Sequence, residues 1–163
     1  MSLITAYLAL GSNLGQRLEQ MRSALKLLRE SSIVIIEVSP VYENRAIGMG
    51  AADPFLNAVV QVQTELDPEE LLEVCLAIEA QLGRVRSKAW SPRNIDIDIL
   101  AYGQLHLETE KLSLPHPRIA ERDFVLQPLA DIAPNFELHG KSIDTWLDEL
   151  PVVELTRIEN KLI

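Results

Sequence analysis

The fold is decided by residues 55–83, which read FLNAVVQVQTELDPEELLEVCLAIEAQLG. Residues 55–64 are mainly apolar and β-branched, which predicts a buried strand. Residues 67–70 then combine an N-cap aspartate, a first-turn proline and a capping-box glutamate, so a helix begins there. Gly83 suits the position just past its end. The apolar stripe between these two signals consists of Leu71, Val74 or Cys75, Ile78 and Leu82.

The flanking segments repeat the same two patterns. Apolar runs at residues 4–10, 32–42 and 95–102 predict three more strands. A stripe at helical spacing predicts a helix after the first strand, with Ser12 or Asn13 as its N-cap. That stripe consists of Leu14, Leu18, Met21, Leu25 and Leu28. The order β-α-β-β-α-β is a split βαβ unit, which closes as an antiparallel sheet with both helices on one face.

The last third of the chain, from Gly103 on, shows weaker patterns. One helix is predicted near residues 122–129, among turns and short strands. Pro134, Gly140 and Pro151 divide the rest into short pieces. The expected fold class is therefore α+β, with a C-terminal extension on the β-α-β-β-α-β core.

Composition narrows the class of protein. The chain has 163 residues, 47% apolar and 24% charged, which suits one globular domain with its own core. A net charge of −9 argues against a nucleic-acid partner, which needs clustered positive charge. The single cysteine, Cys75, excludes an intrachain disulfide and any CxxC motif. The sequence shows neither a membrane-length apolar run nor a signal-peptide pattern, so we expect a soluble, cytoplasmic protein with no membrane partner.

Two carboxylates mark the strand at residues 95–102. In the run Ile-Asp-Ile-Asp-Ile at 95–99, the isoleucines should face the core while Asp96 and Asp98 share the other side. Neighbouring carboxylates repel each other unless a cation lies between them. Mg²⁺ commonly takes one or two carboxylates together with phosphate oxygens. The alternative is an ordinary amphipathic strand with one solvated face.

The loop before this strand is positively charged, although the chain as a whole is acidic. Residues 84–93 contain no acid and four basic side chains, which are Arg84, Arg86, Lys88 and Arg93. Arginine matches phosphate oxygens bidentately, so this loop and the paired aspartates together suit a metal–polyphosphate site. Equally, the basic residues could pair with surface acids. Trp90 in the same loop either packs into the core or covers a flat ligand.

Two further groups could bind a planar ligand or a nucleotide. Phe55 and Asn57 lie two apart on a strand and so share a face, as an aromatic ring and an amide beside a heterocycle would. His116 lies between two prolines, near Arg122 and Phe124. Both groups have simpler explanations, a strand-end asparagine and a surface histidine. Residues 10–15 match neither a P-loop nor a GxGxxG dinucleotide motif.

Taken together, these motifs resemble the 6-hydroxymethyl-7,8-dihydropterin pyrophosphokinase family of folate biosynthesis. The family signature has the form Pro-Arg-x-x-Asp-x-Asp, and residues 92–98 read Pro-Arg-Asn-Ile-Asp-Ile-Asp. The resemblance extends over nearly the whole chain. The segments that carry it are residues 7–15, 55–59, 83–86, 90–99, 114–118 and 122–129.

The resemblance implies a ferredoxin-like fold in a single domain, residues 1–163. It implies transfer of the diphosphoryl group of ATP to the hydroxymethyl group of 6-hydroxymethyl-7,8-dihydropterin, with release of AMP. Asp96 and Asp98 would hold two Mg²⁺ ions, while Arg84 and Arg93 would hold phosphate oxygens and offset developing charge. It implies no obligate protein partner. Whether an aspartate accepts the hydroxyl proton, or metal coordination suffices, stays open.

The resemblance also implies two sets of binding residues. Arg86 and Trp90 would belong to a loop that closes over the substrates. Asn57 would hydrogen-bond the pterin, Phe124 would stack on it and Phe55 would line its pocket. The ATP-binding residues would be Glu79, Arg86, Trp90, Pro92, Arg93, Ile99, Lys111, Ser113, His116 and Arg122. The pterin-binding residues would be Asn44, Arg45, Ala46, Ile47, Gly48, Phe55, Asn57, Trp90 and Phe124.

One loop departs from the family pattern. Residues 44–48 read NRAIG, where the family usually carries a Thr-x-Pro-x-Gly-like stretch. Without the proline the loop is less constrained, so we expect activity with altered pterin affinity. Two alternatives stay open. A ferredoxin-like RNA-binding module is disfavoured by 5% aromatic content and the net charge. A catalytically weak pterin- or nucleotide-binding protein is the other.

Overall fold

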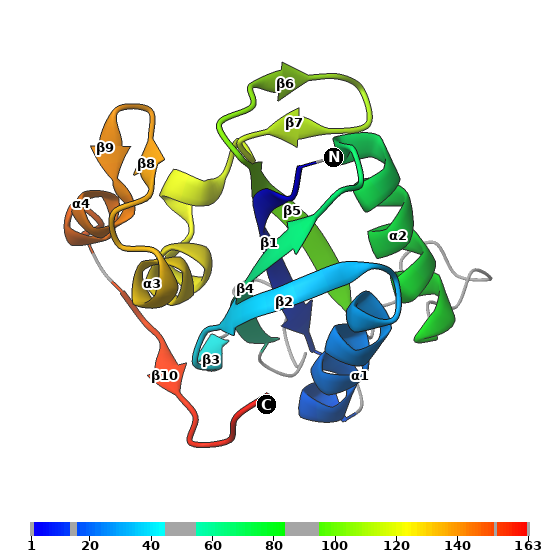
Figure 1. Ribbon diagram of the computed structural model, residues 1–163. Coiled ribbons are helices and arrows are strands. Elements are labelled where there is room, and N and C mark those ends of the chain that lie inside the picture. The colour runs from blue at the N-terminus through cyan, green and yellow to red at the C-terminus, as the bar shows by residue number, and fades with distance from the viewer. Residues whose placement is uncertain (1, 14–15, 45–54, 84–94, 152, 163) are drawn as a thin grey trace.

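A computed structural model describes residues 2–13, 16–44, 55–83, 95–151 and 153–162. Its main element is a six-stranded sheet in the order β10-β3-β4-β1-β5, with β2 also paired to β4 (Figure 1). These strands pair antiparallel. They are β1 (Ile4–Ser12), β2 (Ile33–Val38), β3 (Tyr42–Asn44), β4 (Phe55–Thr64), β5 (Asp96–Tyr102) and β10 (Thr156–Arg157).

Helices cover both faces of this sheet. The helices are α1 (Arg17–Arg29), α2 (Pro68–Gln81), α3 (Asp123–Ile132) and α4 (Ile143–Asp148), with a 3-10 turn η1 (Ile119–Glu121). Two small hairpins join β6 (Leu107–Glu108) to β7 (Ser113–Leu114) and β8 (Glu137–Leu138) to β9 (Lys141–Ser142). Within the described residues, none of the helices has both the length and the apolar character needed to span a bilayer.

Two apolar clusters show how the layers are held together. As predicted, α1 and α2 pack on the same sheet face, where Leu25 and Ile78 meet inward-facing residues such as Val60. The C-terminal third covers part of the other face, where Leu126 of α3 packs with Val59. Figure 1 shows α1 and α2 on one side of the sheet and α3 with α4 on the other.

The second strand differs from its prediction. The single strand expected at residues 32–42 is two strands, β2 and β3, separated by residues 39–41, which include Ser39 and Pro40. Ser39 still pairs with β4: its N–H donates to the Val59 carbonyl at 2.9 Å, and its hydroxyl accepts from the Val59 N–H at 2.8 Å. The side chain thus replaces a backbone carbonyl in the ladder, next to a proline that has no N–H to contribute.

The helix-start predictions had opposite outcomes. For α2 the capping box is present: the Glu70 N–H donates to Asp67 Oδ1 at 2.8 Å, and the Asp67 N–H donates to Glu70 Oε1 at 3.0 Å. For α1 the predicted cap at Ser12 or Asn13 is wrong. Ser12 still belongs to β1, where it pairs with Leu56, and the helix begins after Gln16 without a side-chain cap.

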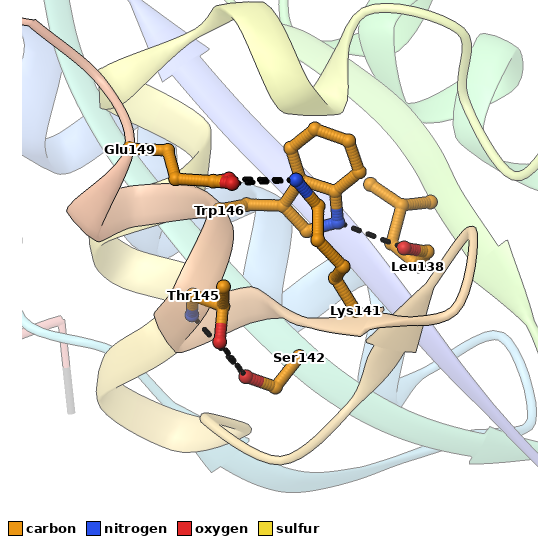
Figure 2. A network of polar contacts seen from close by, with 6 residues as sticks. All are labelled: Leu138, Lys141, Ser142, Thr145, Trp146 and Glu149. Atoms are coloured by element: carbon orange, nitrogen blue, oxygen red, sulfur yellow. Dashed lines mark hydrogen bonds and ion pairs between the residues drawn. The ribbon is translucent and has the colours of Figure 1, made fainter.

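A polar network fixes the hairpin β8–β9 to α4 (Figure 2). The indole N–H of Trp146 donates to the Leu138 carbonyl at 2.8 Å. Lys141 lies 3.8 Å from the centre of the Trp146 ring and 2.6 Å from a Glu149 carboxylate oxygen. Ser142 caps α4 by accepting the Thr145 N–H at 3.2 Å. The network therefore keeps the hairpin and helix together as one cover over α3 and the sheet.

The capping box yields a stability prediction. Asp67→Ala removes the acceptor of the Glu70 N–H, so the free energy of unfolding should fall by about 1 kcal/mol. Glu73→Ala is the matched control, because it removes the same charge from an exposed position in the middle of α2. Urea denaturation measures both variants. Equal stability of the two variants would contradict the capping role.

Candidate functional site

The central strand brings the predicted site residues into one row. Gly11 of β1 pairs with Asn57 of β4 on one side and with Asp96 of β5 on the other. Directly paired residues of antiparallel strands share a face of the sheet. In the next row, Ala9 pairs with Val59 and with Asp98. Asn57 and the two aspartates therefore lie on the same face, that of α3 and α4, although they are far apart in the sequence.

The alternation predicted for residues 95–99 is confirmed. The side chains of Ile95, Ile97 and Ile99 are buried in the cluster beneath α1 and α2. Asp98 is exposed and Asp96 is partly exposed on the opposite face. Two accessible carboxylates on one short stretch of strand fit a hard cation that also takes phosphate oxygens.

Metal-ligating side chains are otherwise sparse here. Among the residues that the structure describes, no group of three or more His, Cys, Asp and Glu side chains is placed to hold a metal ion. Among the described residues, the predicted oxygen donors at this position are the carboxylates of Asp96 and Asp98, and a hard cation held there would also take oxygens from substrate or water.

Asn57 lies in a buried amide cluster at the end of β4. Its side chain is 7% exposed, and its Nδ2 donates to the side-chain oxygen of Asn44. Asn44 pairs in register with the partly buried Phe55. The three described residues of the predicted pterin set that come from β3 and β4 are thus brought together.

Tyr42 is a neighbour of this cluster that the sequence did not single out. It pairs in register with Asn57 and donates its hydroxyl hydrogen to Asp131 on α3. Burial, reinforced by the Asp131 carboxylate, raises the pKa of Tyr42 to about 12. The phenol therefore stays protonated and keeps its donor role, which ties α3 to the sheet edge beside Asn57. Tyr42 lies two residues before Asn44 on a strand, so the sequence could have indicated that the two side chains share a face.

His116 lies beside β5 and close to Asp98. The backbone N–H of His116 donates to the Leu100 carbonyl of β5 at 2.8 Å. Its ring Nδ1 accepts the backbone N–H of Arg118 at 3.2 Å. In the neutral ring the proton therefore sits on Nε2. Burial lowers the pKa of His116; Asp98 opposes this, and the positive charges of Arg122 and Arg118 add to it. The imidazole is thus a neutral donor at pH 7.

Arg122 and Phe124 adjoin each other where α3 begins. The guanidinium carbon of Arg122 lies 5.6 Å from the centre of the Phe124 ring, a cation–π contact. Phe124 also packs against the apolar cluster of the second face. Since Arg122 also contributes to the electrostatics of His116, it lies near both the predicted nucleotide-side residue His116 and the predicted pterin-side residue Phe124.

The other described residues of the predicted ATP-binding set differ in their exposure. Glu79 is 3% exposed, and its Oε2 accepts the Ile97 N–H at 2.7 Å, between the two aspartates. The side chain of Ile99 lies in the core, opposite Asp98. Lys111 is exposed between β6 and β7, and Ser113 is partly buried on β7. The side chain of Glu79 therefore contacts the backbone of β5, the strand that carries the two aspartates, and covers part of its edge.

Several predicted site residues lie outside the described part of the chain, so their roles stay predictions. They are Arg45, Ala46, Ile47, Gly48, Arg84, Arg86, Trp90, Pro92 and Arg93.

Comparisons with known proteins agree on one family. A family model described as 7,8-dihydro-6-hydroxymethylpterin-pyrophosphokinase (HPPK) matches residues 7–134. A protein of Methylorubrum extorquens named 2-amino-4-hydroxy-6-hydroxymethyldihydropteridine pyrophosphokinase is 44% identical over 155 residues, which are 94% of this chain and 98% of that protein. A Bacillus subtilis protein of the same name is 44% identical over 141 residues, covering 86% of this chain and 84% of its own.

Solved structures show the same fold at low sequence identity. A Plasmodium falciparum HPPK-DHPS triple mutant superposes with a TM-score of 0.72 over 91% of this chain at 18% identity. This chain spans 44% of that longer chain. The wild-type P. falciparum HPPK-DHPS structure gives a TM-score of 0.69 at 18% identity, again over 91% of this chain. At such identities the likeness concerns the fold alone.

The electrostatics of His116 yield a pH prediction. Its pKa should lie below the ordinary value of 6.5, and Asp98→Asn should lower it further, because the carboxylate favours the charged ring. Since the folded pKa is depressed, the unfolded chain binds the proton more readily, so this group lowers stability as the pH falls through 6.5. NMR titration of the ring resonances measures both values. An unchanged pKa in Asp98→Asn would contradict the predicted proximity.

Proposed function

This chain belongs to the 7,8-dihydro-6-hydroxymethylpterin-pyrophosphokinase family, and we propose that it transfers the diphosphoryl group of ATP to the hydroxymethyl group of 6-hydroxymethyl-7,8-dihydropterin. The products are AMP and the pterin diphosphate, an intermediate of folate biosynthesis. The observation that carries the proposal is the row of Asn57, Gly11 and Asp96 across three strands. This row puts the buried amide of Asn57 and the carboxylate of Asp96 on one sheet face, which supports a site for a heterocycle beside a metal–phosphate group.

The proposed fold class is the ferredoxin-like α+β core. The alternating order of strands and helices supports it, as does the antiparallel pairing of β1 with both β4 and β5. In such a unit each helix crosses over the sheet between parallel strands that have one antiparallel strand between them. That arrangement puts β1 between β4 and β5. The two halves of the proposed site, on β4 and on β5, therefore lie on either side of β1.

On the acceptor side, the proposed contacts are polar at the edge of the heterocycle and aromatic on its faces. The Asn57 amide, held by Asn44, would hydrogen-bond the ring. Phe124, at the start of α3, would stack on it, and Phe55 would line the pocket. Because Asn57 is already buried and partnered, its orientation is fixed before the substrate arrives, which lowers the entropic cost of binding.

On the nucleotide side, the proposed contacts are carboxylates for the metal and positive or neutral donors for phosphate. Asp96 and Asp98 would hold two Mg²⁺ ions. When bound, these ions neutralise phosphate charge and orient the diphosphoryl group. Arg122, together with Arg84 and Arg93 of the basic loop, would add positive charge, while neutral His116 would donate from Nε2. Positioning and charge neutralisation supply most of the acceleration in such transfers, so no protein nucleophile is required.

A product assay tests the proposal. With ATP, Mg²⁺ and the pterin, we expect AMP to form in step with pterin diphosphate, and only when the pterin is present. Asp96→Asn and Asp98→Asn should each reduce turnover by about 1,000-fold, the factor that corresponds to about 4 kcal/mol of lost charge stabilisation. Asp148→Asn, the same change at an exposed site on α4, should leave turnover unchanged.

Three results would contradict different parts of the proposal. ADP in place of AMP would indicate a kinase that transfers one phosphoryl group. Binding of ATP without any turnover would indicate a binding protein. Wild-type turnover in both aspartate variants would refute the metal assignment while leaving the reaction itself intact.

A further inference from the structure

Gly11 is the second-last residue of β1, paired with β4 on one side and β5 on the other, and its backbone does not call for glycine. Its φ is not in the left-handed region, unlike those of Gly83, Gly103 and Gly140. The irregularity in the pairing of β1 with β5 lies between Tyr7 and Leu8 and so does not involve Gly11. A glycine inside a regular strand weakens the strand, because it loses more conformational freedom on folding than other residues and packs no side chain.

The protein itself leaves room for a larger residue at this position. A Cβ added to Gly11 would lie 3.5 Å from the Asn57 side-chain oxygen and 3.8 Å from the Leu56 carbonyl, both ordinary van der Waals distances. Gly11 is nonetheless partly exposed, so the side chains of the described residues do not fully cover it. A strand glycine with no backbone reason of its own often marks a place where a ligand approaches the backbone closely.

The position of this gap indicates which ligand group would use it. Along this face of β1 the side chains shrink from Tyr7, which packs on Phe136 at 5.2 Å between ring centres, through Ala9 to Gly11. Neighbouring strands lie about 4.8 Å apart, so Asn57 and Asp96 are separated by about 10 Å with Gly11 between them. A substrate held by its ring at Asn57 and reacting near Asp96 has to cross Gly11.

We propose that Gly11 is a specificity-determining position: the missing side chain admits the short link between the acceptor's heterocycle and its reacting hydroxyl group against the β1 backbone. This inference rests on the proposed function, since it takes Asn57 as the ring contact and Asp96 as part of the metal site. A Cβ at position 11 would lift the hydroxymethyl group away from the sheet and out of line with the diphosphoryl group. ATP, bound on the β5 side, would be affected far less.

The test compares Gly11→Ala and Gly11→Ser with Gly140→Ala. Gly11→Ala should raise the thermal unfolding midpoint, because alanine suits a strand better than glycine, yet lower kcat/KM for the pterin by about tenfold or more. The KM for ATP should stay within about twofold of wild type. The loss of kcat/KM for the pterin should be larger in Gly11→Ser than in Gly11→Ala. Gly140→Ala should lower the unfolding midpoint and leave the kinetics unchanged. The φ of +81° at this position strains an alanine, and the position lies far from the site.

The outcomes separate the inference from the function on which it rests. A wild-type protein that forms AMP and pterin diphosphate, with unchanged pterin kinetics in both Gly11 variants, overturns the inference alone. A lower unfolding midpoint in Gly11→Ala also overturns it, because the fold would then require the glycine. A wild-type protein that never uses the pterin refutes the proposed function, and the inference with it.

Discussion

The pairing register of β1 is the constraint on which the candidate site depends. From Ile4 opposite Thr64 to Ser12 opposite Leu56, β1 and β4 pair without a shift. A slip of one residue would turn every side chain of one strand to the other face. Both faces resist such a slip, because Leu8 and Val60 are needed in the core beneath α1 and α2, while Val59 is needed beneath α3. Core packing thus decides which residues stand beside Gly11.

The second face explains why the site lies at one end of the sheet. The cover formed by α3 and α4 packs over Tyr7, Val59 and Leu100, and the row of Asn57 and Asp96 lies beyond that cluster. The hydrogen bond from Tyr42 to Asp131 holds α3 against the sheet edge beside that row. The cover that completes the core therefore also carries Phe124 toward the site, so stability and substrate positioning share the same contacts.

The sequence predicted the features that depend on local patterns. The strand at residues 55–64 has the predicted bounds, and the capping box set the start of α2 because its signals lie within four residues. The break at Ser39 and the late start of α1 depend on pairing with β4, which no local pattern reports. Likewise, alternation along the strand already predicted a common face for Asp96 and Asp98, but that Asn57 shares this face became clear only with the register. Tyr42 and the contact of Glu79 with Ile97 were missed because both depend on distant partners.

A crystal structure of the chain with a non-hydrolysable ATP analogue, Mg²⁺ and the pterin is the most direct measurement. We expect metal density at Asp96 and Asp98, the heterocycle hydrogen-bonded to Asn57, and its hydroxymethyl group against Gly11. A heterocycle elsewhere would contradict the shared sheet face as the site of reaction. One such place is the cavity of about 430 Å³ near the start of α1, lined by Arg17, Glu43 and Ile158 among others.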